Sequence, residues 1–247
     1  MRRRAWLLVA AVLGGCCACP PCGTDEEGFA PLFNGVDLAG WEGATADYGV
    51  DPSEPGVLQC WGRNDPLRPD EHRNLCTVKS YANFILRFDF MVPENGDNGL
   101  GLRITDPAKD AAFDALCEIQ LLDDFGSRYY DVEKGCPRLQ PWRYAGSAFG
   151  IAAAQHVCEK SRVRANRWVA AEVKVVGDEV EVSFNGCRVT KADLAQFAGT
   201  GDTPDGRLHP GIRNRRGRIG WLGHDWNVKW RNIRIRELPE DVRMCDE

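Results

Sequence analysis

The sequence predicts an all-β protein in which two antiparallel sheets pack face to face as a jelly-roll sandwich. Apolar and polar residues alternate with a period of two along several segments, and glycine-rich turns separate these segments. Helical periodicity is confined to two short segments, residues 108–116 and 191–198. Many antiparallel strands with few helices are typical of a sandwich, and a chain of 247 residues is long enough to bury its core.

The predicted strands share this alternation of apolar side chains. In order, they cover residues 83–92, 100–105, 117–124, 169–176, 179–184, 218–224 and 227–238. The first is the clearest, because Phe84, Leu86 and Phe88 fall on one face while Arg87 and Asp89 fall on the other. We therefore expect each strand to bury one face in a core between the sheets.

Turn signals separate the strands. Residues 93–99 form a turn-rich loop, and Asn185-Gly186 predicts a type I′ hairpin turn. In the last strand the alternation slips by one residue, and a β-bulge near Arg231-Asn232 would restore it.

The N-terminus is predicted to be a lipoprotein signal peptide, residues 1–15. Three arginines precede an apolar run that is too short to cross a bilayer. The run ends in Leu-Gly-Gly before Cys16, which resembles the bacterial site of lipid attachment, so Cys16 would carry the lipid and anchor the chain to the membrane. Secretion with cleavage nearby is the alternative. We expect an exported protein of the bacterial cell envelope, in the outer membrane or the periplasm.

One folded domain is expected at residues 29–238. The lipidated cysteine and a flexible linker precede it at residues 16–28, and a polar tail follows at 239–247. The net charge of −5 gives no support for nucleic acid as a partner. No heptad pattern or exposed apolar stripe is present, which favours a monomer.

The chain is rich in cysteine, with eleven residues. An exported chain meets an oxidising compartment, so disulfides are expected, and their connectivity is left open by the sequence. Apart from Cys16, the cysteines are Cys17, Cys19, Cys22, Cys60, Cys76, Cys117, Cys136, Cys158, Cys187 and Cys245.

Polar residues on two predicted strands form the first candidate site. Arg103, Glu118 and Gln120 each alternate with the apolar residues of their strand, and Asp123 follows at a strand end. If the two strands pair, Arg103 and Glu118 share one open face of a sheet. Gln120 can both donate and accept hydrogen bonds, which suits sugar hydroxyls. The alternative is a solvated face with a surface ion pair.

A glycine-flanked loop and several tryptophans supply further candidates. His224 lies between two predicted strands and is a candidate acid, base or metal ligand, or else an ordinary surface histidine. Trp142, Trp221 and Trp226 are candidates for stacking on a sugar, with packing in the protein as the alternative.

Six segments together carry a wider pattern. They are GFAPLFNGVDLAGWEG (28–43), LCTVKSYANFILRFDFMVPENGDNGLGLRI (75–104), CEIQLLDD (117–124), PWRYAGSAFGI (141–151), FNGCRV (184–189) and GRIGWLGHDWNVKWRNIRIREL (217–238). In this order they resemble the 3-keto-disaccharide hydrolase domain family over nearly all of residues 28–238. The resemblance implies a concanavalin/LamG-like jelly roll, in agreement with the strand pattern, and an exported protein that is often a lipoprotein.

The resemblance also implies cleavage of glycosides whose sugar has been oxidised at C3. A ketone at C3 acidifies the C2 hydrogen, a base removes it, the enediolate expels the C1 substituent, and water adds to the product. In this interpretation Glu118 is the base, Arg103 stabilises the oxyanion, and His224 protonates the leaving group.

The remaining candidates in this interpretation contact the oligosaccharide or glycoside substrate. Asp123 and Gln120 would orient it, and Asn98, Trp142 and Trp221 would bind it. The chain departs from the usual pattern of the family in four places: no serine stands between Asn98 and Gly99, Cys117 replaces a glycine, Phe149 replaces the usual tyrosine, and residues 152–154 lack a proline.

Three questions stay open at this point. The sequence establishes no cofactor and leaves open whether a divalent metal held by carboxylates and His224 replaces Arg103 as the electrophile. The same fold could also serve as a non-catalytic carbohydrate-binding module, because fold does not fix function. A structural lipoprotein of the cell envelope is the third interpretation.

Overall fold

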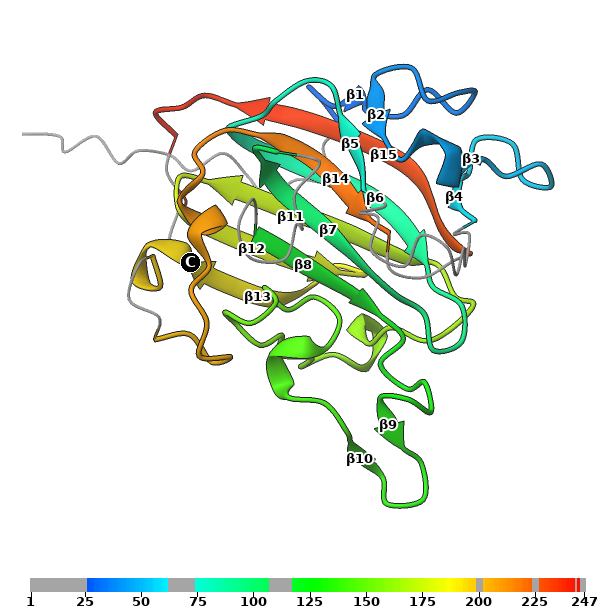
Figure 1. Ribbon diagram of the computed structural model, residues 1–247, viewed down its shortest axis with the longest axis vertical. Helices are drawn as coiled ribbons and strands as arrows, with labels where there is room; N and C mark the ends of the chain where they lie inside the picture. Colours follow the sequence, from blue (N-terminus) through cyan, green and yellow to red (C-terminus); the bar gives the residue numbers. More distant parts are fainter. Residues whose placement is uncertain are drawn as a thin grey trace, which may run out of the picture.

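The computed structural model describes residues 26–61, 74–106, 117–198, 202–223, 227–242 and 244. These residues form a β-sandwich of two large antiparallel sheets (Figure 1), and the helices among them are short 3-10 turns. The predicted all-β jelly-roll fold is therefore confirmed. Cys16, His224, Trp226 and the helix expected at 108–116 lie outside the described residues.

The larger sheet has the strand order β13-β12-β11-β6-β15-β4-β3, and β1 also pairs with β15. Its eight strands are β1 (Ala30–Pro31), β3 (Tyr48–Val50), β4 (Leu58–Cys60), β6 (Asn83–Met91), β11 (Val169–Val176), β12 (Glu179–Phe184), β13 (Cys187–Asp193) and β15 (Val228–Leu238). Strand β6 pairs with both β11 and β15, so segments far apart in the sequence meet at the centre of this sheet.

The smaller sheet has the order β2-β5-β14-β7-β8. Its five strands are β2 (Trp41–Gly43), β5 (Leu75–Thr77), β14 (Arg218–Leu222), β7 (Asp97–Ile104) and β8 (Cys117–Leu122). Strand β14 lies between β5 and β7 although it follows them by more than a hundred residues in the sequence.

Short elements complete the described chain. A separate hairpin of β9 (Tyr130–Asp131) and β10 (Cys136–Pro137) projects from the lower end of the sandwich in Figure 1. The 3-10 turns are η1 (Thr45–Asp47), η3 (Pro141–Arg143), η4 (Glu159–Ser161), η5 (Leu194–Gln196) and η6 (Pro210–Arg213).

Two local predictions are confirmed by the backbone. Asn185 and Gly186 have φ values of 49° and 75°, as the two central residues of a type I′ turn require. The register of β15 against β6 shifts between Arg231 and Arg234, and Asn232 takes a φ of 54° there. The predicted β-bulge thus lies where the apolar alternation slips.

The helix predicted at 191–198 is wrong. Residues up to Asp193 belong to β13, and only Leu194–Gln196 form a 3-10 turn. The hairpin turn delivers this segment to the edge of β12, where Ala192 pairs with Val180. Strand pairing therefore overrides a weak helical pattern.

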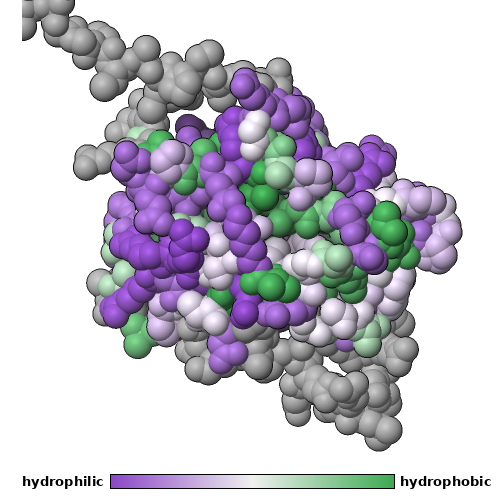
Figure 2. Space-filling model, turned by 90° about the horizontal axis from the view of Figure 1, so that it is seen from above, coloured by the Kyte–Doolittle hydropathy of each residue, from purple (hydrophilic) through white to green (hydrophobic). Residues whose placement is uncertain are grey.

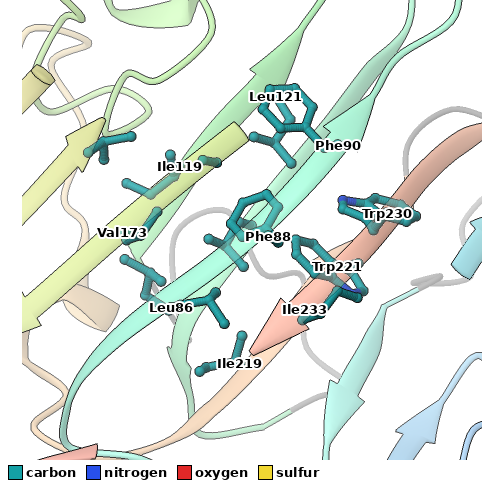
Figure 3. Close-up of a cluster of buried hydrophobic side chains, with 14 of the residues drawn as sticks. Leu86, Phe88, Phe90, Ile119, Leu121, Val173, Ile219, Trp221, Trp230 and Ile233 are labelled. Carbon is teal, nitrogen blue, oxygen red and sulfur yellow. The ribbon is translucent and has the colours of Figure 1, made fainter. Parts of the chain in front are cut away.

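Trp221 lies at the centre of the core between the two sheets (Figure 3). Its ring stacks on Trp230 with centroids 4.8 Å apart and on Trp41 with centroids 6.4 Å apart, and Phe88 meets it edge-on at 5.0 Å. Trp221 is fully buried and lies opposite Leu100, another core residue. The expectation that Trp221 stacks on a sugar is therefore wrong.

Charged side chains occupy the face of the larger sheet that points away from the core. Arg87 on β6 pairs with Glu172 on β11 at 2.6 Å, and Arg234 on β15 pairs with Glu26 at 2.6 Å. Figure 2 shows hydrophilic residues around smaller hydrophobic patches on the upper end of the molecule.

Within the described ranges, no helix is long and apolar enough to cross a lipid bilayer.

Replacing the central tryptophan tests this description of the core. We expect Trp221→Ala to lower the free energy of unfolding by about 3–5 kcal/mol, because it leaves a cavity among stacked rings. Trp142→Ala is the control: Trp142 is partly exposed and makes one edge-on contact with Phe149, so we expect a loss of about 1 kcal/mol. Urea denaturation measures both, and equal losses would contradict the central position of Trp221.

Candidate functional site

The outer face of the five-stranded sheet carries the candidate site. Glu118 and Gln120 alternate along β8 with Ile119 and Leu121, whose side chains belong to the core. Because successive side chains of a strand point to opposite faces, Glu118 and Gln120 point away from that core. Each is only 4% exposed, so a carboxyl group and an amide are held side by side out of bulk water.

Glycines on β7 make room for Glu118. The register places Gly101 opposite Glu118 and Gly99 opposite Gln120. A Cβ atom at Gly99 would overlap Oε1 of Glu118 and would lie 2.9 Å from Leu222 Cδ1. The carboxyl group of Glu118 therefore lies across β7 above Gly99, where a larger residue would displace it.

Asp97 orients Gln120. Gln120 Nε2 donates a hydrogen bond to Asp97 Oδ1 at 3.1 Å, and Asp97 is the first residue of β7. Gln120 Oε1 is buried and accepts no hydrogen bond within the described residues. Buried polar atoms in proteins are generally paired, so this oxygen is an acceptor available to a bound hydroxyl group.

Residues 146–149 continue the five-stranded sheet beyond β8. Gln120 N donates to Ser147 O at 3.0 Å, and Phe149 N donates to Glu118 O at 2.9 Å. Ser147 and Phe149 thus lie beside Gln120 and Glu118 in this extended sheet. Phe149, which replaces the expected tyrosine, is consequently next to the candidate base.

An aromatic pair borders the outer face. Trp142 meets Phe149 edge-on, with ring centroids 5.3 Å apart and an interplanar angle of 87°. The guanidinium carbon of Arg143 lies 5.9 Å from each ring centroid. Both rings are partly exposed, so Trp142 stays a candidate for contact with a sugar.

The part of the outer face away from β8 is apolar, with one ion pair. Cys76, Ile104 and Leu222 form a small buried cluster that is separate from the main core. Arg218 Nη2 lies 2.9 Å from Glu42 Oε1, so β14 and β2 are linked across β5.

A β-bulge in β7 turns Arg103 away from Glu118. The register between β7 and β14 shifts between Arg218 and Gly220, and Arg103 takes a φ of 56° at this point. This left-handed conformation is uncommon for a residue with a side chain and is typical of bulges. The alternation reverses there, which also places Ile104 on the outer face instead of in the core.

The Arg103 guanidinium is occupied by acceptors of the protein itself. They are Ala82 O (2.9 Å from Nε and 2.7 Å from Nη2), Gly177 O (2.6 Å from Nη1), Asn214 O (3.1 Å from Nη1) and Asn83 Oδ1 (3.3 Å from Nη2). Burial lowers the pKa of Arg103 to about 10. The expectation that Arg103 shares a face with Glu118 and stabilises an oxyanion is therefore wrong: Arg103 joins β7 to the ends of β6 and β11.

Asp123 is engaged with loops rather than with the outer face. Its carboxylate accepts hydrogen bonds from Asn95 N at 3.0 Å, Ala165 N at 3.2 Å and Phe125 N at 3.3 Å. Three loop segments are thus held at the end of β8. This assigns Asp123 to loop anchoring, in contrast to the expected role in orienting substrate.

Asn98 also differs from its expected role. The register places it opposite Leu121, on the side of β7 that faces the core, and it is fully buried. Its Oδ1 accepts a hydrogen bond from Gly99 N at 2.9 Å. Asn98 therefore does not share the outer face with Glu118.

The structure reveals a buried histidine–aspartate pair that no sequence motif indicates. His209 Nε2 lies 3.1 Å from both carboxylate oxygens of Asp205. Burial acts to raise the pKa of Asp205, but hydrogen bonds from His209, Arg207 and Thr203 outweigh it and lower that pKa. A Cβ at Gly150 would lie 2.8 Å from His209 Cε1, so the pair packs next to the sheet extension that borders Glu118.

The family follows from a match over most of the chain. Residues 28–236 match the model of the family described as the 3-keto-alpha-glucoside-1,2-lyase-like domain. The chain belongs to this family. The resemblance found in the six sequence segments is thereby confirmed. None of the curated proteins matches this chain.

Two solved structures resemble this lyase-like domain. Both are from Parabacteroides distasonis ATCC 8503, and both are provisionally named glycosyl hydrolases. One is 26% identical with a TM-score of 0.66, and the match covers 85% of this chain and 99% of that chain. The other is 23% identical with a TM-score of 0.70, covering 86% and 95%. The family and the first of these structures indicate a carbohydrate-active domain.

The lyase-like domain thus gathers only part of the expected site. Glu118 and Gln120 lie together on the outer face, with Trp142 at its border. The other expected residues serve the fold, in loop contacts or in the core: Arg103, Asp123, Asn98 and Trp221. His224 lies outside the described ranges. Within those ranges, no group of three or more His, Cys, Asp and Glu side chains could hold a metal ion, so the structure offers no described ligand set for the divalent metal that the sequence left open.

A buried carboxyl group anchors the segment that extends the sheet. Asp124 accepts hydrogen bonds from Ala145 N at 3.1 Å and Val163 N at 2.9 Å. Burial raises its pKa to about 7. The neighbouring His156, whose pKa burial lowers, contacts Ala145 O at 3.0 Å and Ser161 Oγ at 3.1 Å. Asp124 therefore holds both ends of the loop that runs from Ala145 to Val163.

Replacing Arg103 tests whether it is structural. We expect Arg103→Gln to lower the free energy of unfolding by about 3 kcal/mol, because several buried carbonyl groups lose a charged donor. Arg138→Gln is the control, since Arg138 is half-exposed and pairs with Asp131 at 3.2 Å; exposed pairs contribute about 1 kcal/mol or less. Chemical denaturation compares the two, and a loss no larger than that of the control would reject the structural role.

The pKa of Asp124 makes stability depend on pH. The folded value of about 7 lies above the usual value of 3.8, so the folded state retains a proton that the unfolded state releases. The stability from this group is fully present below about pH 4 and is lost as the pH rises through about 7. As the pH rises from about 4 to about 7, the free energy of unfolding of Asp124→Asn should increase relative to that of wild type, by up to about 1.4 kcal/mol per pH unit. Urea denaturation at several pH values measures the difference, and a constant difference would show that Asp124 does not titrate there.

Proposed function

We propose that this domain cleaves glycosidic bonds of sugars that carry a ketone at C3, and that Glu118 is the base that starts the reaction. The observation that carries the proposal is the buried carboxyl group of Glu118 beside the oriented amide of Gln120 on the outer face of the five-stranded sheet. Membership of the 3-keto-alpha-glucoside-1,2-lyase-like family supports the substrate class.

The reaction needs few groups because the ketone does much of the chemistry. Glu118 removes the proton from C2, and the electron pair moves into the enolate formed with the C3 ketone. The enolate then expels the substituent at C1, and water adds across the resulting double bond. A base that is shielded from bulk water, as Glu118 is, can act on a carbon acid without competing solvation.

The neighbouring residues would hold the sugar. Gln120 Oε1 accepts a hydrogen bond from a sugar hydroxyl, while Asp97 fixes the amide through its nitrogen. Trp142 and Phe149 offer aromatic rings to the apolar face of the sugar. His224 is retained as the proposed acid for the leaving group, on the basis of its glycine-flanked position in the sequence.

We also propose that the domain acts in the bacterial cell envelope, attached through a lipid on Cys16. The basic, apolar and small residues before Cys16 support this location. The linker at 16–28 would separate the domain from the membrane surface.

The decisive experiment replaces the proposed base. Purified Glu118→Gln should release the aglycone from a chromogenic 3-keto-glucoside with a kcat/KM lowered by about 10²–10⁴-fold, and its melting temperature should stay close to that of wild type. Glu172→Gln is the matched control, because Glu172 pairs with Arg87 on the larger sheet, and it should retain full turnover.

A second variant tests the geometry rather than the carboxyl group. Gly99→Ala keeps Glu118 but displaces its carboxyl group, so it should also lower kcat. Turnover by Glu118→Gln equal to that of wild type would overturn the assignment. If wild type binds keto-sugars and cleaves none of them, the domain is a carbohydrate-binding module instead of an enzyme.

A further inference from the structure

Two cysteines face each other where a long connection passes the edge of the larger sheet. Gln155 N donates to Val189 O at 2.6 Å, and Asn185 Nδ2 donates to Lys160 O at 2.6 Å. These two bonds make residues 155–160 run antiparallel to residues 185–189. Counting from the first bond places Gly186 opposite Cys158, and counting from the second bond places Cys187 opposite Cys158.

The contact between the two thiols resolves that one-residue difference. Val157, which precedes Cys158, is 79% exposed, whereas Cys158 is only partly exposed. Cys187 is buried at the start of β13. The Cys187 thiol lies within hydrogen-bonding reach of Cys158 and is the main cause that raises the pKa of Cys158.

The distance between such neighbours suits a covalent bond. Opposed residues of antiparallel segments have Cα atoms about 4.5–5.5 Å apart, and disulfides join Cα atoms about 4.4–6.8 Å apart. The structure holds both residues as free thiols. The contact between the two thiols is the arrangement from which a disulfide can form.

The other described cysteines are placed differently. Cys60 belongs to the main core and Cys76 to the small outer cluster. Cys117 lies on β8, which β14 and β7 separate from the β5 strand of Cys76. Cys136 is exposed on the projecting β9–β10 hairpin. Among the described residues, Cys158 and Cys187 are thus the pair that the backbone brings together.

We propose that Cys158 and Cys187 form a disulfide that fixes the connection between β8 and β11 to the β12–β13 hairpin. The oxidant is the disulfide of a dithiol oxidoreductase. The Cys158 thiolate attacks one oxidant sulfur and forms a mixed disulfide, and one oxidant thiolate leaves. The Cys187 thiolate then attacks the Cys158 sulfur and releases the second oxidant thiolate. The two cysteines lose two electrons and two protons, and the oxidant becomes a dithiol.

The bond closes a loop that contains β11 and β12, and it bears on the candidate site. The connection that it fixes includes residues 146–149, which extend the sheet beside Glu118, and it continues through His156 to Cys158. Together with Asp124, which holds Ala145 and Val163, the disulfide would restrain this connection from two directions. The proposal itself does not depend on the proposed enzymatic activity.

Peptide mapping of the full-length protein tests the bond directly. The protein is treated with oxidised glutathione and then unfolded in denaturant that contains an alkylating agent, which blocks free thiols. It is then digested without reductant. We expect a peptide pair joined through Cys158 and Cys187, lighter than the two reduced peptides by two hydrogen atoms. Alkylation of both residues in the oxidised sample would overturn the proposal, as would a link from either one to another cysteine.

Thermal unfolding supplies a second measurement. Cys158→Ser, Cys187→Ser and the double variant should each lower the melting temperature of the oxidised protein by the same amount, about 5–15 °C. Reductant should lower the melting temperature of wild type by a similar amount and should leave the melting temperatures of the three variants unchanged. Cys136→Ser is the control and should match wild type. Additive losses in the double variant, or a wild type that is insensitive to reductant, would contradict the disulfide.

Discussion

The alternation of side chains along β14, β7 and β8 is the constraint on which the rest of this structure depends. One face of these strands supplies Trp221, Leu100 and Ile119 to the core, where stacked aromatic rings hold the two sheets together. The strict two-residue period then leaves the opposite face for Glu118 and Gln120. The core and the candidate site are two sides of one sheet, so the packing that stabilises the fold also fixes where the carboxyl group lies.

Departures from regular pairing give this face its chemistry. The glycine at position 99 lets the Glu118 side chain lie flat over β7. The bulge at Arg103 reverses the alternation, removes a guanidinium from the outer face, and replaces it with Ile104. The result is a carboxyl group and an amide beside an apolar surface. That combination suits a base acting on a carbon acid better than an exposed ion pair would.

Buried polar groups hold the loops around the sandwich. Arg103 binds carbonyl groups at the ends of β6 and β11, and Asp123 and Asp124 bind amides of the loops before β7 and after β8. Each group satisfies backbone atoms that strands leave unpaired, which is the usual reason for a charged residue to be buried. Residues that look functional because they are polar and regularly spaced can therefore serve the loops instead.

The sequence by itself determined the fold class, the seven strands β6, β7, β8, β11, β12, β14 and β15, the Asn185-Gly186 turn and the bulge in β15, because these depend on local alternation and turn chemistry. It also placed Glu118 and Gln120 on one face. The tertiary structure decided the roles of Arg103, Asp123 and Trp221, because the bulge, the loop amides and the second sheet come from distant parts of the chain. The His209–Asp205 pair lies in an irregular loop, where no period exists to reveal it, and only the folded backbone sets Cys158 against Cys187.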